Sequence, residues 1–121
     1  MAERGFTLLE MMISLAVFMV GLAGVVSLQV ASSHGVATAN EITLATNIAA
    51  AKLEQLNVTS FDALADGTET YNKQGAFDGT SPYFTVTWSV AGLEIKDITV
   101  AVAWSMGAAN HSIALASQRA R

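Results

Sequence analysis

The chain has 121 residues, the size of one ordinary domain. Hydrophobic residues make up 52% and charged residues 13%, so the composition excludes a disordered chain and is unusually poor in charge. With a formal net charge of −4 and six basic residues, no positive surface for nucleic acid is expected. The absence of cysteine excludes disulfides, zinc–thiolate sites and thiol catalysis.

The charge deficit is concentrated in one segment near the amino terminus. No Asp, Glu, Lys or Arg occurs over the 30 residues from Met11 to Asn40, and Met11–Leu28 is apolar apart from two serines. That length suits a membrane-spanning helix. Three interpretations compete: a secretory signal peptide, a simple membrane anchor, or a segment with a specialised amino terminus. The signal peptide fits worst, because the start has no net positive charge and no clean Ala-x-Ala follows the apolar run.

Glu10 is an isolated acid at the edge of this apolar run. A carboxylate costs ~2.5–3.5 kcal/mol at the centre of a bilayer and less near the interface. One interpretation is an interfacial acid at the start of a helix, where the helix dipole favours negative charge. The other is that Glu10 needs a cationic partner, supplied by another chain or by a new amino terminus made by cleavage upstream.

The segment Gly5-Phe6-Thr7-Leu8-Leu9-Glu10, followed at once by the apolar run, resembles the processing motif of type IV pilins and of type II secretion pseudopilins. The resemblance implies that a prepilin peptidase removes a leader peptide, residues 1–5, by cutting between Gly5 and Phe6. It implies that Phe6 is then N-methylated. It also implies that Glu10 meets the amine of a neighbouring subunit during assembly, because a paired charge is tolerated in an apolar bundle and an unpaired one is not.

Helical periodicity continues beyond the apolar run. Spacings of three and four predict one covered helix face, made of Ile42, Ala45, Ala49, Leu53 and Leu56. We expect one helix over 6–57, about 75 Å long. Residues 6–30 would form the transmembrane and filament-core part, and 31–57 an amphipathic part covered by the domain. The end of this helix resembles the corresponding helix end of PilV-like minor pilins. A run of good helix formers with a solvated edge at Lys52 and Glu54 is by itself a sufficient explanation of the same residues.

Residues 58–121 predict a small carboxy-terminal domain of loops and strands. The stretch 57–81 is rich in turn formers, with one short helical turn at Phe61 and Leu64 that fills the core. Alternating apolar residues then predict three strands, near 83–90, 98–105 and 113–116, joined by short connections. The expected fold class is α+β and pilin-like: one very long N-terminal helix packed against a small antiparallel β-meander of about three strands. The core candidates are Phe84, Trp88, Trp104 and Ile113.

The sequence offers no candidate catalytic residue, cofactor site or metal site, so an enzyme is not expected. The two histidines, His34 and His111, are far apart in the sequence. The acidic residues of the loop region match no calcium-loop spacing; they are Asp62, Asp66, Glu69 and Asp78.

The resemblance implies a structural subunit, a minor pilin of a type IV pilus that is assembled into the filament or primes it. The alternatives are a type II secretion pseudopilin and an unprocessed single-pass membrane-anchored binding protein. The implied partners are other pilins or pseudopilins in a helical filament, prepilin peptidase/methylase and an inner-membrane assembly platform. The implied location is the bacterial inner membrane, as a single-pass prepilin with its C-terminal domain in the periplasm, and afterwards a pilus or pseudopilus filament.

Overall fold

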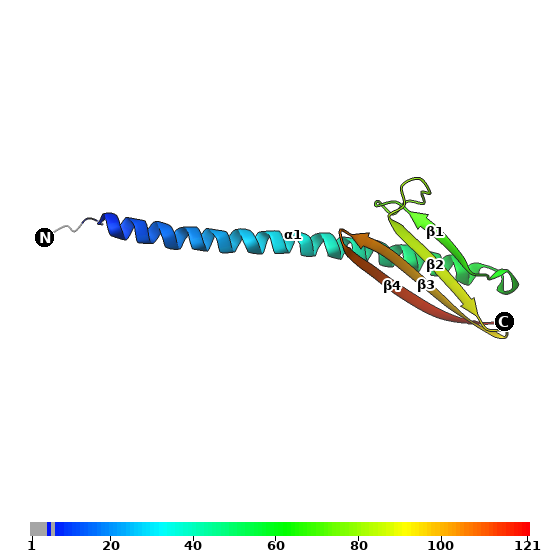
Figure 1. The fold of residues 1–121 in the computed structure, drawn as a ribbon. Helices are drawn as coiled ribbons and strands as arrows, with labels where there is room; N and C mark the ends of the chain where they lie inside the picture. The colour runs from blue at the N-terminus through cyan, green and yellow to red at the C-terminus, as the bar shows by residue number, and fades with distance from the viewer. Residues whose placement is uncertain (1–4, 6) are drawn as a thin grey trace. The chain divides into compact units, whose positions relative to one another are not determined.

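The computed structural model describes residue 5 and residues 7–121. The elements in chain order are α1 (Leu8–Val58), the 3-10 turn η1 (Phe61–Ala63), β1 (Gly67–Tyr71), β2 (Phe84–Ala91), β3 (Ile95–Met106) and β4 (Ala109–Ala120) (Figure 1). This architecture confirms the predicted fold class, a long amino-terminal helix packed against a small antiparallel sheet. The chain divides into two compact units, one ending at Ala39 and one running from Asn40 to Arg121.

In the first unit, α1 presents its side chains to the surroundings on every side. All residues from Leu8 to Ala37 are exposed. An 18-residue stretch of this helix has a mean hydropathy of 2.4, so the helix is long and apolar enough to cross a membrane. None of the residues in that stretch is buried. A helix that is apolar all round requires an apolar environment, which lipid or other helices supply.

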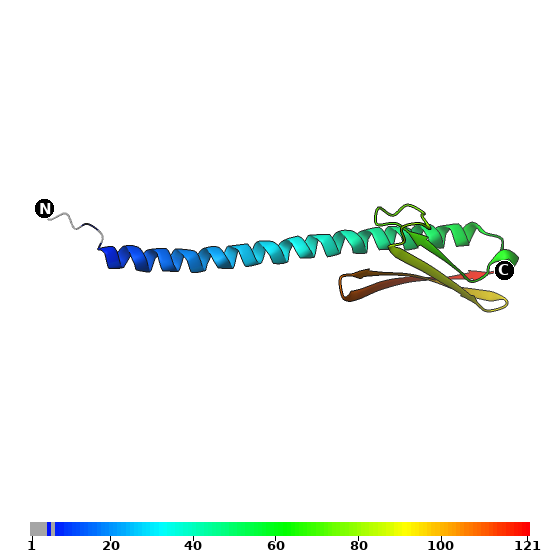
Figure 2. The same cartoon turned by 45° about the horizontal axis from the view of Figure 1, so that its top comes forward.

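The second unit is a four-stranded antiparallel sheet in the order β1-β2-β3-β4, with the Asn40–Val58 part of α1 lying over one face (Figure 2). One core is formed by buried residues of α1, of β2 and of β3, together with Leu64 after η1. Its members are Ala45, Ile48, Ala49, Leu56, Leu64, Phe84, Val86, Ile98, Val100, Val102 and Trp104. The core candidates Phe84 and Trp104 are therefore confirmed, while Trp88 and Ile113 are half-buried and pack against this core.

The predicted covered face of α1 is confirmed at three positions, Ala45, Ala49 and Leu56, and Leu53 is half-buried. Ile42 is the exception, with 43% of its surface exposed. The reason is that Glu41 turns toward the sheet in its place. The Glu41 carboxylate accepts hydrogen bonds from the Tyr83 hydroxyl at 2.7 Å and from the Trp104 Nε1–H at 3.0 Å.

The sheet has one strand more than the sequence pattern predicts. That strand, β1, lies in the stretch interpreted as turns and loops, and it pairs with β2 from Gly67↔Trp88 to Tyr71↔Phe84. None of its five residues is fully buried, so it lacks the apolar alternation that reveals the other strands.

The sequence also predicts Lys52 on a solvated edge, and this is wrong. Lys52 is only 5% exposed. Its Nζ lies 3.0 Å from Glu69 Oε1 on β1, 3.2 Å from Gln55 Oε1 and 3.9 Å from the centre of the Trp88 ring. The unpredicted strand therefore carries the counter-charge that makes burial of this lysine tolerable.

The carboxy-terminal end of α1 is capped from a distant part of the chain. The last turn of α1 contains no basic residue. Arg119 of β4 instead donates hydrogen bonds to the carbonyl oxygens of Leu56 and Thr59. A guanidinium at this end of a helix satisfies free carbonyls and complements the negative end of the helix dipole.

Candidate processing and assembly site

Thr7 and Glu10 form a reciprocal cap at the start of α1. The Thr7 backbone N–H donates to Glu10 Oε2 at 2.9 Å, and the Glu10 N–H donates to Thr7 Oγ1 at 3.2 Å. This is a capping box, in which a threonine and a glutamate three residues later satisfy each other's free backbone donors. The pattern Thr-x-x-Glu is a helix-start signal in the sequence, and it agrees with the start of α1 at Leu8.

The Glu10 carboxylate is exposed in the isolated chain. Among the described residues, its hydrogen-bond partners are the backbone and hydroxyl of Thr7, and neither is a cation. A capping glutamate of this kind keeps acceptor capacity, because a carboxylate has about four lone-pair positions. Glu10 is therefore placed at the amino-terminal edge of the apolar helix with room for a cation from another molecule.

Gly5 is exposed and lies before α1, outside any helix or strand. A Cβ built on Gly5 meets no atom within 4 Å, and its φ lies outside the positive range that favours glycine. The fold of this chain therefore gives no reason for a glycine at this position. A requirement from outside the chain, such as close approach of an enzyme to the backbone, would explain it.

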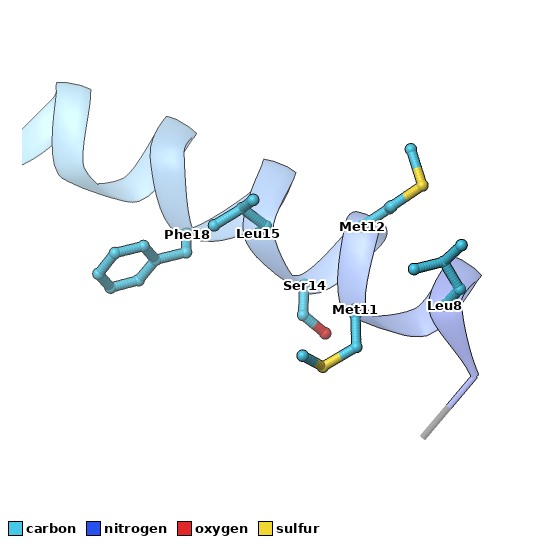
Figure 3. Close-up of a pocket in the computed structure, with 6 residues that line it drawn as sticks. All are labelled: Leu8, Met11, Met12, Ser14, Leu15 and Phe18. Carbon is cyan, nitrogen blue, oxygen red and sulfur yellow. The ribbon is translucent and has the colours of Figure 1, made fainter. Parts of the chain in front are cut away.

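The apolar surface begins directly after this cap. Figure 3 shows side chains from successive turns of α1 that line one shallow surface concavity: Leu8, Met11, Met12, Ser14, Leu15 and Phe18. Leu8 is 79% exposed and Phe18 63%. Each of these turns offers apolar area to a neighbour, and flexible methionines adapt readily to the shape of a partner surface.

The sequence also singled out Phe6, His34 and His111. Phe6 lies outside the described residues. His34 is exposed on α1, and the His111 ring stacks on Trp104 with 5.6 Å between ring centres.

The four acidic residues of the loop region do not converge. Asp62 pairs with Arg121, Asp66 accepts the Val90 N–H, Glu69 pairs with Lys52, and Asp78 accepts the Thr80 N–H and hydroxyl. The bonds from Thr80 hold the pKa of Asp78 below its usual value. In the described part of the chain, no group of three or more His, Cys, Asp or Glu side chains could hold a metal ion.

Comparison with known families agrees with this geometry. Residues 1–26 match the family described as the prokaryotic N-terminal methylation motif. The match spans residues 1–7, the capped start of α1 and the first turns of the apolar helix. No curated protein and no solved structure matches the chain significantly.

The match and the fold together support a type IV prepilin-like protein. The match supports a protein of the type IV pilin or pseudopilin type, which prepilin peptidase processes, and the family of this motif is structural. The exposed apolar helix behind the motif fits a membrane-anchored pilin.

Proposed function

We propose that this chain is a minor pilin of a type IV pilus. The prepilin is held in the inner membrane by the apolar part of α1 with its second unit in the periplasm. Prepilin peptidase cuts between Gly5 and Phe6, Phe6 is N-methylated, and the mature subunit enters or primes the filament through its apolar helix. The leader is then 1–5, the helix 6–57 and the carboxy-terminal domain 58–121.

One observation carries this proposal: a methylation motif is joined without a break to a helix whose apolar side chains are exposed from Leu8 to Ala37. A prepilin needs both parts, since the motif prepares the amino terminus and the helix supplies the packing surface. The short second unit and the resemblance of the end of α1 to PilV-like minor pilins support a minor subunit.

The direct test is mass analysis of the amino terminus of the protein from its own host and from a strain that lacks prepilin peptidase. We expect a chain that starts at N-methylated Phe6 in the first case and at residue 1 in the second. A chain with an intact leader in both strains would refute processing and favour an unprocessed membrane-anchored protein. Gly5→Val is a matched variant, because the open space around Gly5 lets the fold accept the side chain. It should block cleavage without altering thermal unfolding.

The role of Glu10 in assembly can be separated from its role in the cap. Glu10→Gln keeps a capping box, since glutamine serves at this position as well as glutamate, but it removes the negative charge. We propose that Glu10 pairs with the amine of Phe6 in a neighbouring subunit, so Glu10→Gln should be cleaved normally and fail to enter filaments. Thr7→Ala is the control for the cap, because it removes the hydroxyl and leaves the charge. Equal incorporation of Glu10→Gln and the wild type would refute the charge pairing.

A further inference from the structure

The face of the sheet turned away from α1 carries almost no charge. Burial alternates along the strands, so one set of side chains enters the core beside α1 and the other points to the opposite face (Figure 2). We call this opposite surface the outer face. Its side chains are only threonine, serine and alanine over 85–89 of β2, 99–105 of β3 and 112–116 of β4. An ordinary soluble surface has about 25–35% charged residues, so this face is unusual for one that meets only water.

The outer face is hollowed at two places. The first hollow, the Asn110 concavity, has a volume of about 210 Å³. Its outward lining residues are Thr85, Ala103, Ser105 and Asn110. The second hollow, the Gln118 concavity, has a volume of about 500 Å³. Its outward lining residues are Asp97, Thr99, Ala116 and Gln118. Along β3 the step from Thr99 to Ala103 separates the two concavities by ~13 Å.

The polar groups of both concavities keep free donors and acceptors. Among the described residues, the side chains of Thr85, Ser105 and Asn110 have no hydrogen-bond partner. In the other concavity the Gln118 Nε2–H donates to Asp97 Oδ1 at 2.8 Å. This bond leaves a carboxylate oxygen, the amide oxygen and the second amide hydrogen for a ligand. Each concavity therefore suits a ligand that both donates and accepts hydrogen bonds.

The same residues disfavour other kinds of partner. No lysine or arginine lines either concavity, and Asp97 is acidic, so an anionic ligand would be repelled. The cores of protein interfaces are rich in aromatic residues, methionine and arginine, whereas the outward residues here are small and hydroxylated. Stacking of the outer face on a second copy would bury hydroxyls and amides against alanine, which costs free energy because they lose water without gaining partners.

We propose that the outer face binds a neutral, extended oligosaccharide that lies along β3, with one sugar ring in each concavity. Sugar hydroxyls donate and accept hydrogen bonds, which matches the hydroxyl and amide groups of both concavities. The paired carboxylate and amide of Asp97 and Gln118 suit two neighbouring hydroxyls of one ring. The alanines between the concavities let a ring approach the sheet closely. This activity goes beyond the proposed function and lies wholly within the second unit, so it does not depend on cleavage or on filament entry.

The test is a calorimetric and NMR titration of the full, uncleaved chain with two neutral extended tetrasaccharides, cellotetraose and tetra-N-acetylchitotetraose. A polyoxyethylene detergent is required, because detergents with sugar headgroups would compete for the site. At least one tetrasaccharide should bind with a Kd of about 1 mM or tighter. The amide signals of Thr85, Thr99 and Ala103 should shift, and that of Ala50 on α1 should not. The matching disaccharide reaches only one concavity and should bind at least about tenfold more weakly.

Ala103→Leu is the matched variant in the protein. Ala103 is exposed in the Asn110 concavity, so a larger side chain fills the space of the ligand and should weaken tetrasaccharide binding by about tenfold or more. Ala50→Leu makes the same change at an exposed position of α1 and should leave binding unchanged. Asn110→Ala and Gln118→Ala should each weaken binding by about three- to tenfold, because each removes a hydrogen-bonding group. They also carry the test if tryptophan fluorescence shows that Ala103→Leu is not folded.

Four results would overturn the proposal. The first is no binding of either tetrasaccharide at about 10 mM. The second is equal affinity for the tetrasaccharide and its disaccharide, and the third is wild-type affinity in both folded Asn110→Ala and folded Gln118→Ala. The fourth is a shift of the same outer-face amides that grows with protein concentration in the absence of sugar, which would assign the outer face to a second copy of this chain.

Discussion

Replacing Glu69 by glutamine should cost more stability than replacing Lys52 by methionine, although both changes break the same ion pair. The asymmetry follows from burial, because the Lys52 side chain is 4% exposed and that of Glu69 is 30% exposed. In Glu69→Gln the ammonium stays buried and loses its counter-charge. In Lys52→Met the carboxylate that remains can be hydrated, and it keeps the hydrogen bond from the Tyr71 hydroxyl at 3.2 Å.

The magnitudes follow from the same contacts. Breaking a fully buried ion pair from one side costs about 3–5 kcal/mol. For Glu69→Gln we expect about 2–3 kcal/mol, because the glutamine oxygen and the Trp88 ring still face the ammonium. For Lys52→Met we expect about 0.5–1.5 kcal/mol, since methionine fills the space beside Trp88 and partly exposed ion pairs contribute little. The difference corresponds to roughly 5–10 °C in Tm for a domain of this size.

Urea unfolding of the full chain in non-ionic detergent measures both costs. Tryptophan fluorescence reports on the second unit, because Trp88 and Trp104 are the two tryptophans of the chain. The double variant Lys52→Met with Glu69→Gln should be less destabilised than the sum of the single variants, as expected for residues in direct contact. Lys52→Met unfolding at a lower urea concentration than Glu69→Gln would refute the argument from burial.

Three further predictions concern the second unit. Arg119→Met should lower stability by about 1–2 kcal/mol in thermal unfolding, because the free carbonyls at the end of α1 lose their donor, and an unchanged Tm would contradict this. The hydrogen bond to Glu41 and burial raise the pKa of Tyr83 to about 12; since the unfolded hydroxyl ionises near 10, its contribution is complete below pH 10 and is lost between pH 10 and 12. Tyr83→Phe should flatten stability over that range, and an identical pH profile would count against the assignment. Gly67→Ala should cost about 1–3 kcal/mol and shift tryptophan fluorescence, because its Cβ would overlap the Trp88 ring; wild-type fluorescence and stability would show that the ring does not pack there.

The strongly periodic elements could be predicted from the sequence. Strands β2, β3 and β4 were visible because apolar residues alternate along them, and the long helix was visible because its spacing continues without a proline. The predicted turn at Phe61 is η1, and Leu64 is buried in the core as expected. In each case a local pattern reported directly on burial.

What the sequence did not predict depends on contacts between distant residues. Lys52 looks solvated in its local context, and only pairing with Glu69, 17 residues away, makes its burial possible. β1 itself is held by pairing with β2 and carries no apolar pattern of its own. At the candidate site, Glu10 was predicted from the motif, whereas its cap with Thr7 was missed although the local Thr-x-x-Glu pattern indicates it.

The cap on α1 has a consequence for the order of events during synthesis. Arg119 lies 60 residues after Thr59, whose carbonyl it binds. At about 5–20 residues per second, a ribosome needs on the order of 3–12 seconds to add that length of chain. For this interval the end of the helix lacks the Arg119 donor, although a helix forms in microseconds. A nascent chain stopped before Arg119 would therefore hold a helix that is complete in length and lacks the Arg119 hydrogen bonds at its end.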